Sequence, residues 1–313
     1  MPTTIITDGS MDKLVEAPPV VLPGRSLFSD RAARFDALGS SEMLGGYMRL
    51  MAHVCRGQAK AYIARAPQVI DAKALESSRN YGMPPLSAHV FPRGSAWHAD
   101  LRDLLAHVSQ QEAVLTTELK SSLASLQSAL DNHAELVESC ADRLIAGDPL
   151  PEDGAWYPFV GAALQVFFAR MAASLEVADV SACDIATVCP CCGLRPTGSV
   201  IRLDPERQNY RYLACALCQT EWNMSRVKCT SCESEKGVGY LIIDEEGRSA
   251  SDAAVRAETC DECKTYLKIF VQEKEPTIDV IADDLNTLAL DMLVHEKGYA
   301  RTGPNFLFYP GHE

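Results

Sequence analysis

The sequence predicts an α+β protein, in which an N-terminal all-α helical domain is followed by two tandem cysteine-rich modules and a C-terminal helix. Two observations lead to this prediction. Apolar residues recur at helical spacing through most of the first 186 residues, whereas short β-type runs alternate with cysteine pairs from residue 187 to about 273. The chain has 313 residues and is 47% hydrophobic, which is enough to supply a sizeable core.

The N-terminal part is predicted to be a flexible lead-in over residues 1–26 and a helical domain over residues 27–186. Clustered prolines and little periodicity indicate the lead-in. Residues 66–94 contain glycine and several prolines, and they are expected to form an irregular connection. Helical spacing of apolar residues predicts helices over 30–38, 41–65, 96–108, 110–146 and 155–175.

The C-terminal part is predicted to hold two modules, at 187–226 and 227–275, and then a helix and tail at 276–313. Each module contains two cysteine pairs and runs of β-type residues that can form a hairpin. The final helix is expected over residues 279–297. Three of its aspartates are expected to be solvated or to cap the helix, and these are Asp283, Asp284 and Asp291.

Four Cys-x-x-Cys pairs lie between residues 189 and 263. Each pair is a short turn that aims both sulfurs at one ion, and eight thiols are the ligand count of two tetrahedral four-sulfur sites. Disulfide bonds are disfavoured, because such pairs in a chain without a secretory signal are typical of metal or redox chemistry. The predicted metal ligands are Cys189, Cys192, Cys215, Cys218, Cys229, Cys232, Cys260 and Cys263.

The spacing leaves two groupings of the pairs open. A sequential grouping joins the first pair with the second and the third with the fourth, so that each group encloses one hairpin. An interleaved grouping would make the hairpins cross each other's module, so the sequential grouping is favoured. Cys191 lies inside the first pair and is expected to point outward, because adjacent residues of the turn cannot both face the ion; a redox-sensitive thiol or substitute ligand is the alternative.

Closed all-thiolate sites leave no coordination position for a substrate, which disfavours hydrolysis at the metal. The sequence also lacks a Gly-rich phosphate-binding loop and a nucleophile elbow. We therefore expect a protein that is not an enzyme. Alternating strands and thiol turns are typical of rubredoxin-like or zinc-ribbon-like modules with four cysteine ligands, and zinc would act there as a structural staple, whereas iron could also change valence.

The net charge of -13 and the pI near 5.0 oppose general affinity for nucleic acids and membrane surfaces, which are polyanionic. Arginines and aromatic residues around Trp222 are the one feature that favours nucleic-acid binding. The N-terminus lacks the pattern of a signal peptide, and no segment reaches the length of an apolar membrane helix. We expect neither export on its own signal nor stable membrane insertion.

A long central block resembles the signature of the FdhE-type formate dehydrogenase accessory proteins, and it reads VCPCCGLRPTGSVIRLDPERQNYRYLACALCQTEWNMSRVKCTSCES. The resemblance continues in IADDLNTLALDMLVHEKGYARTGPNFLFYPG and is consistent with LQVFFARMAASL in the helical region, so it covers most of the chain. The ordered set of cysteine motifs is far more specific than any single pair. Cys191 departs from the family pattern, in which a residue without a thiol is more usual.

The resemblance implies a cytoplasmic protein that helps to mature respiratory formate dehydrogenases by contacting their molybdenum- or tungsten-containing catalytic subunit. It also implies iron in rubredoxin-like sites, with the eight paired cysteines as ligands; zinc stays the alternative metal. Two other functions remain open at this point, a rubredoxin-like electron-transfer protein and a nucleic-acid-binding zinc ribbon. The sequence does not decide whether the chain forms a homodimer.

Overall fold

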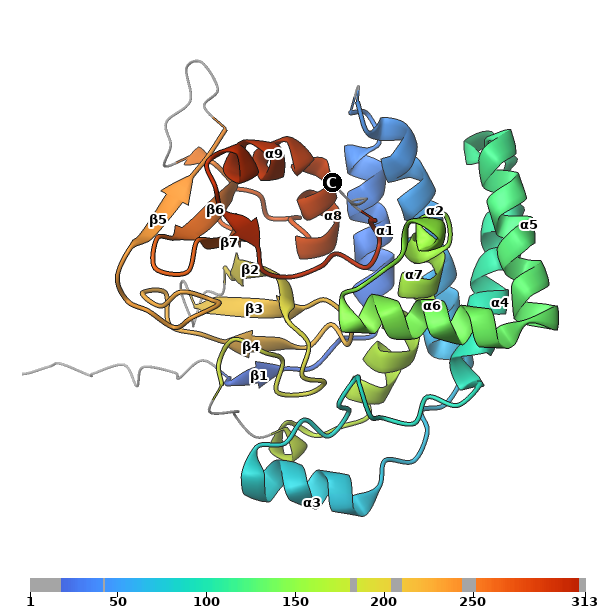
Figure 1. The fold of residues 1–313 in the computed structure, drawn as a ribbon, viewed down its shortest axis with the longest axis horizontal. Coiled ribbons are helices and arrows are strands. Elements are labelled where there is room, and N and C mark those ends of the chain that lie inside the picture. The colour runs from blue at the N-terminus through green and yellow to red at the C-terminus, as the bar shows by residue number, and fades with distance from the viewer. Residues whose placement is uncertain (1–17, 42, 181–184, 204–209, 244–251, 310–313) are drawn as a thin grey trace, which may run out of the picture.

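The computed structural model describes residues 18–41, 43–180, 185–203, 210–243 and 252–309. Figure 1 shows a helical region beside a region built on a sheet, and the last two helices, α8 and α9, lie beside the sheet. The predicted α+β class, with helices before strands, is confirmed. Within the described residues, no helix is both long enough and apolar enough to span a bilayer.

The helical region is built around one helix that is buried on all sides. This helix, α7 (Tyr157–Ala172), has a single residue, Pro158, that is not fully buried. Its apolar composition on every face predicted this position. The other long helices are α1 (Leu27–Leu38), α2 (Gly45–Ala64), α4 (Ala96–Ser109), α5 (Thr117–Asn132) and α6 (Ala134–Ala146); three short 3₁₀ turns are Glu112–Val114, Pro151–Asp153 and Val177–Asp179.

The segment expected to be irregular contains a further helix, α3 (Ala72–Tyr81). Asp71 caps this helix by accepting a hydrogen bond from the backbone N–H of Lys73, and Gly82 ends it with φ of 63°. Ser78 is the only fully buried residue of α3, so no apolar stripe announces the helix in the sequence. It lies apart from the other helices, at the bottom of Figure 1.

The long helical pattern over residues 110–146 predicted one element, and the structure has two. His133 takes φ of -144° and ψ of 52°, which ends α5 and begins α6. The apolar stripe continues across the break because both helices bury their apolar faces in the same core. Periodicity alone therefore did not reveal the break.

The sheet runs in the order β1-β4-β3-β2-β7-β6-β5, and β8 pairs with β7. Its strands are β1 (Val20–Val21), β2 (Pro196–Ile201), β3 (Arg211–Cys215), β4 (Glu221–Asn223), β5 (Val238–Leu241), β6 (Val255–Cys260), β7 (Thr265–Val271) and β8 (Ala300–Arg301). The two predicted hairpins are present as antiparallel β2–β3 and β5–β6. Their expected turns, at 204–209 and 244–251, lie outside the described residues.

The two cysteine modules share this sheet. In each module the hairpin is extended by a third antiparallel strand, β4 in the first and β7 in the second. Parallel pairing of β2 with β7, with Ser199 opposite Ile269, then joins the modules edge to edge. The sequence predicted tandem modules but carried no signal for the parallel junction between them.

Part of the expected flexible lead-in is a strand. Val20 in β1 pairs with Trp222 of β4 and is only 2% exposed. The backbone N–H of Asn223 also bonds to the Pro19 carbonyl, so residues 18–21 are held against the sheet. The expectation of a loose segment is wrong for these residues, and its first part, residues 1–17, lies outside the described residues.

The predicted C-terminal helix is interrupted at Thr287, giving α8 (Val280–Asn286) and α9 (Leu288–Glu296). Thr287 turns its carbonyl and hydroxyl oxygens toward the ammonium group of Lys268, each at 3.0 Å. Gly298 follows α9 with φ of 85°, as expected for a residue that ends a helix.

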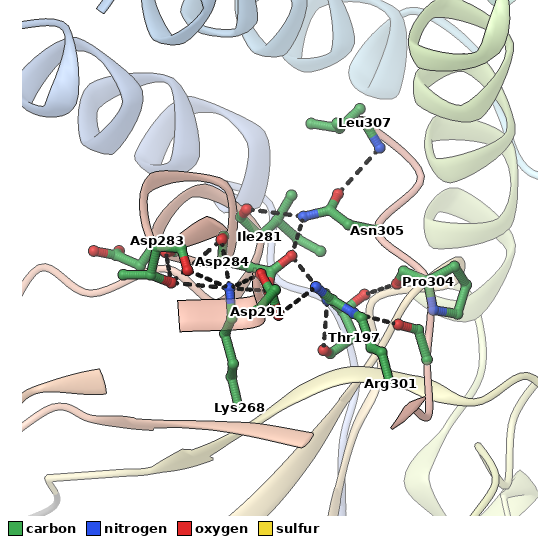
Figure 2. Close-up of polar contacts among 12 residues, drawn as sticks. Thr197, Lys268, Ile281, Asp283, Asp284, Asp291, Arg301, Pro304, Asn305 and Leu307 are labelled. Atoms are coloured by element: carbon green, nitrogen blue, oxygen red, sulfur yellow. Dashed lines mark hydrogen bonds and ion pairs between the residues drawn. The ribbon is translucent and has the colours of Figure 1, made fainter. Parts of the chain in front are cut away.

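The expectation that the aspartates of this region are solvated is wrong. Asp284 is fully buried, and Figure 2 shows it between Lys268 of β7 and Arg301 of β8. Lys268 Nζ lies 3.1 Å from a carboxylate oxygen of Asp284 and 2.5 Å from one of Asp291. Arg301 donates to Asp284 over 2.8 Å. The buried Lys268 and the partly exposed Arg301 thus balance two carboxylates, an arrangement that depends on tertiary structure.

Asp283 and Asp284 differ in their roles. Asp283 accepts a hydrogen bond from the backbone N–H of Asp279 and pairs with Arg34 of α1, so its capping role is correct although it is buried. For Asp284, burial alone would raise the pKa, but the charges of Arg301 and Lys268 lower it to about 2. Asp284 therefore stays ionised inside the protein.

The C-terminal tail ties the sheet region to the helices. Asn305 donates to the Ile281 carbonyl and to Asp284, and accepts from the backbone of Leu307 (Figure 2). Tyr47 of α2 donates to the Leu307 carbonyl. A Cβ on Gly161 of α7 would lie 2.1 Å from the Phe306 carbonyl oxygen, so only glycine allows this close approach.

Candidate metal centres

The eight paired cysteines form two clusters, which we call site 1 and site 2. Within each cluster the four sulfurs all lie within 4.8 Å of one another. The clusters follow the sequential grouping, and the interleaved alternative is wrong. Site 1 consists of Cys189, Cys192, Cys215 and Cys218, and site 2 consists of Cys229, Cys232, Cys260 and Cys263.

The sulfur separations suit a tetrahedral ion. In site 1 the sulfurs of Cys189 and Cys218 are 3.5 Å apart, and those of Cys192 and Cys215 are 3.3 Å apart. In site 2 the corresponding separations across the two pairs are 3.7 Å and 3.8 Å. A tetrahedron with metal–sulfur bonds of about 2.3 Å has edges of about 3.8 Å, so both cages fit an ion such as zinc or iron.

All four cysteine turns share one backbone conformation. The residue that follows each pair has a positive φ: 80° at Gly193, 62° at Gln219, 59° at Glu233 and 55° at Lys264. Among the described residues, the last three are the only non-glycine residues in this region of backbone conformation. Non-glycine residues with a positive φ are uncommon. Their placement after three of the four cysteine pairs shows that the turn geometry overrides their backbone preference.

Backbone N–H groups also point at the sulfurs. Leu217 donates to Cys215 Sγ over 3.4 Å, and Ser231 donates to Cys229 Sγ over 3.3 Å. A threonine hydroxyl oxygen lies near one sulfur of each site, Thr220 at 3.3 Å from Cys218 and Thr265 at 3.0 Å from Cys263. Hydrogen bonds of this kind favour the thiolate form and tune the metal.

Site 1 needs a cation to hold four thiolates. Burial raises the pKa of the Cys189 and Cys192 thiols well above their ordinary value, and the neighbouring sulfurs of the cluster add to the rise at Cys189. A bound divalent ion reverses this preference, because coordinated thiols are deprotonated. The donor set of site 1 therefore fits a metal much better than it fits four free thiols.

Site 1 is fastened to the helical region by main-chain contacts. The side-chain amide of Gln165, in the middle of α7, donates to the Ala216 carbonyl over 2.9 Å. The backbone N–H groups of Leu86 and Ala88 donate to the carbonyls of Cys191 and Cys192, each over 2.9 Å. Both turns of site 1 are thus held by residues that lie far away in the sequence.

Gln219 connects site 1 with α1 and α8. Its amide nitrogen donates to the Cys215 and Ala216 carbonyls, and its oxygen accepts from Arg31 over 2.7 Å. Arg31 is 3% exposed and also pairs with Asp279, which caps α8. No motif marks Gln165, Gln219 or Arg31 in the sequence as residues that hold the metal site. Gln165, a polar residue within the apolar run of α7, was the one sequence feature that could have indicated a buried contact with the site.

Site 2 is much more open than site 1. All four cysteines of site 1 are fully buried, whereas Cys232 is exposed and Cys263 is partly exposed. Cys229 and Cys260 are buried, at 4% and 2% exposure. Solvent therefore reaches one side of site 2.

The expectation that Cys191 points outward is wrong. Its side chain is fully buried and contacts Cys218 of site 1 and Thr220. Residues 84–88 cover this turn, since the backbone N–H of Leu86 donates to the Cys191 carbonyl. This covering segment allows the Cys191 side chain to be buried. Cys191 packs against site 1 as a fifth thiol. The four sulfurs that form the compact cluster do not include it.

Three of the residues that favoured nucleic-acid binding, Trp222, Arg211 and Arg202, are engaged in contacts within the protein. Trp222 is 4% exposed and donates its indole N–H to the Ala186 carbonyl. Arg211 is buried and pairs with Glu258 over 2.7 Å, and Arg202 pairs with Glu221. These side chains stabilise the sheet region instead of forming a basic surface.

Comparisons with known proteins agree along the whole chain. Residues 17–183 match the FdhE N-terminal model, residues 188–226 the FdhE central domain and residues 227–308 the FdhE C-terminal domain. "Protein FdhE homolog" of Pseudomonas aeruginosa is 37% identical over 318 residues, covering 100% of both chains. "Protein FdhE" of Escherichia coli O127:H6 is 34% identical over 297 residues, covering 94% of this chain and 92% of the relative.

A solved structure has the same fold. The crystal structure of the FdhE protein from Pseudomonas aeruginosa matches with a TM-score of 0.82 and 38% identity, covering 94% of this chain and 100% of that chain. Three family models, full-length relatives and this solved structure thus all indicate the same family. The chain belongs to the FdhE family.

Proposed function

We propose that the eight cysteines of sites 1 and 2 bind two metal ions, with iron favoured and zinc as the alternative. The compact, sequentially grouped sulfur clusters are the observation that supports this proposal. When bound, such an ion holds four thiolates together, and iron would add one-electron redox chemistry. The protein supplies the turns, the N–H groups directed at sulfur and, at site 1, the packing that excludes water.

We propose that the protein acts in the cytoplasm as an accessory factor for the maturation of respiratory formate dehydrogenase. Its membership of the FdhE family supports this role, because the FdhE-type resemblance implies formate dehydrogenase accessory proteins. Binding to the catalytic subunit is the proposed activity, and we propose that it involves no reaction catalysed by this chain. Four-sulfur sites without an open coordination position agree with a role in binding.

Co-purification tests this role. The full-length protein carrying an affinity tag is expressed without oxygen together with a formate dehydrogenase catalytic subunit, and is isolated at modest salt. We expect the subunit to elute with the tagged protein, and an unrelated large cytoplasmic subunit expressed in the same way to be washed off. Repeated absence of the catalytic subunit from well-folded, metal-loaded protein would count against the proposal.

Electron transfer is a second candidate function, and the open side of site 2 favours it, because a redox partner could approach the metal there. It requires iron and a visible spectrum that changes reversibly on reduction. A colourless protein with two zinc ions per chain after anaerobic preparation would rule it out. Nucleic-acid binding has no comparable support, because Trp222, Arg211 and Arg202 are engaged internally.

A further inference from the structure

The two sites are surrounded by different kinds of structure. Site 1 belongs to the main hydrophobic core of the protein, together with residues of α2, α4, α6 and α7. Its turns accept hydrogen bonds from Leu86, Ala88 and Gln165 of the helical region. Movement of a site 1 cysteine away from its ion would therefore break the interface between the helices and the sheet.

Site 2 belongs to the second module and is held by contacts within the sheet region. Cys229 bonds to the Ser234 carbonyl, Asp261 to the Gly237 carbonyl, and Ala300 to the Lys264 carbonyl. In the part of the chain that the structure describes, no hydrogen bond joins residues 229–232 or 260–263 to helices α1–α7. Site 2 can open while the rest of the protein stays folded, since local opening costs less than global unfolding.

Cys232 is the ligand through which site 2 would open. It is the one exposed cysteine among the eight, and Val227, two residues before Cys229, is exposed as well. The sulfur of Cys260, 3.8 Å away, is buried beneath it. A donor arriving from solvent would thus meet the ion on the side of Cys232.

We propose that site 2 is a metal-exchange site at which a small soluble thiol displaces Cys232, whereas site 1 holds a structural ion that does not exchange while the protein is folded. This inference rests on the proposed metal binding. In the exchange step the incoming thiolate forms a bond to the ion as the bond to Cys232 Sγ breaks. Cys232 leaves as a thiolate and takes up the proton that the incoming thiol gives up. The other three bonds are then replaced in the same way, and the ion leaves on the soluble thiols with its oxidation state unchanged.

The exchange is measured with the full-length protein loaded with cobalt(II), whose thiolate bands report metal loss. The protein is mixed with an excess of 2,3-dimercaptopropanesulfonate, a soluble dithiol. We expect two phases of one equivalent each, with the first at least about tenfold faster, because release from site 1 requires opening of the core. Far-UV circular dichroism should not change during the first phase.

Two further readouts assign the phases. Cys232→Ser should remove the fast phase and leave the slow one, because it removes the exposed ligand of site 2. Hydrogen exchange in the wild-type protein, measured after the first equivalent has left, should increase at residues 227–241 and 255–265 but not at 187–201. This second readout does not depend on how the variant folds.

The outcomes separate this inference from the proposal on which it rests. Loss of both equivalents at one rate, or an early increase in hydrogen exchange at residues 187–201, would overturn the inference and leave metal binding intact. A folded protein that takes up no cobalt would overturn both. Two phases with the first assigned to site 2 would support the inference whether or not the protein binds a formate dehydrogenase subunit.

Discussion

Cys192→Ser is expected to prevent the protein from folding stably around site 1. Cys192 is fully buried, and the serine hydroxyl is a poor substitute for a thiolate ligand. A structural zinc contributes roughly 10–16 kcal/mol in finger peptides, and whole domains are typically stable by only about 5–15 kcal/mol. Thermal unfolding followed by circular dichroism, together with metal analysis, should show loss of the ion and of the cooperative transition.

Cys232→Ser is the matched control, because it makes the same change at the exposed ligand of site 2. We expect this variant to lose about one equivalent of metal, as one ligand of a four-ligand site is removed, and to keep the transition of the helical region. If Cys192→Ser purified with two ions and unfolded at the wild-type temperature, the structural role assigned to site 1 would be wrong.

Lys268→Met is expected to destabilise the protein by about 3–5 kcal/mol, the usual cost of removing one partner from a buried ion pair. The methionine side chain fills similar space but leaves Asp284 and Asp291 facing a single cation, Arg301. It also leaves the Asp284 and Thr287 carbonyls without the ammonium donor. Chemical denaturation of wild-type and variant proteins, both loaded with metal, measures the difference.

Lys274→Met provides the control for this prediction. Lys274 lies six residues after Lys268, outside both cysteine clusters, and pairs with the exposed Asp252 over 3.7 Å. We expect a change within about 0.5 kcal/mol, as for most surface substitutions. Adding Asp291→Asn to Lys268→Met restores the charge balance and should recover part of the lost stability. Equal effects of the two lysine substitutions would contradict the account of the buried cluster.

The grouping of the cysteines could be predicted because it depends on local spacing. Each pair encodes its own turn, and short uncrossed connections favour the joining of neighbouring pairs. The position of α7 was similarly evident, since an apolar residue on every face leaves a helix no surface to expose to water. These features require little knowledge of which distant segments meet.

Features that depend on distant segments could not be predicted. Lys268 and Asp284 each look like surface residues in the sequence, and only the pairing of β7 with β8 and the packing of α8 brings them together. The burial of Cys191 requires residues 84–88 to cover its turn. The contrast between Cys192 and Cys232 likewise arises from the N-terminal helices, whose core includes the cysteines of site 1 and none of those of site 2.

Metal content and the absorption spectrum of the freshly isolated protein, measured without oxygen, test the central claim most directly. We expect two equivalents of a transition metal per chain, with sulfur-to-iron charge-transfer bands that bleach on reduction if the metal is iron and no visible bands if it is zinc. A protein that is fully folded, has reduced cysteines and contains no transition metal would contradict the account.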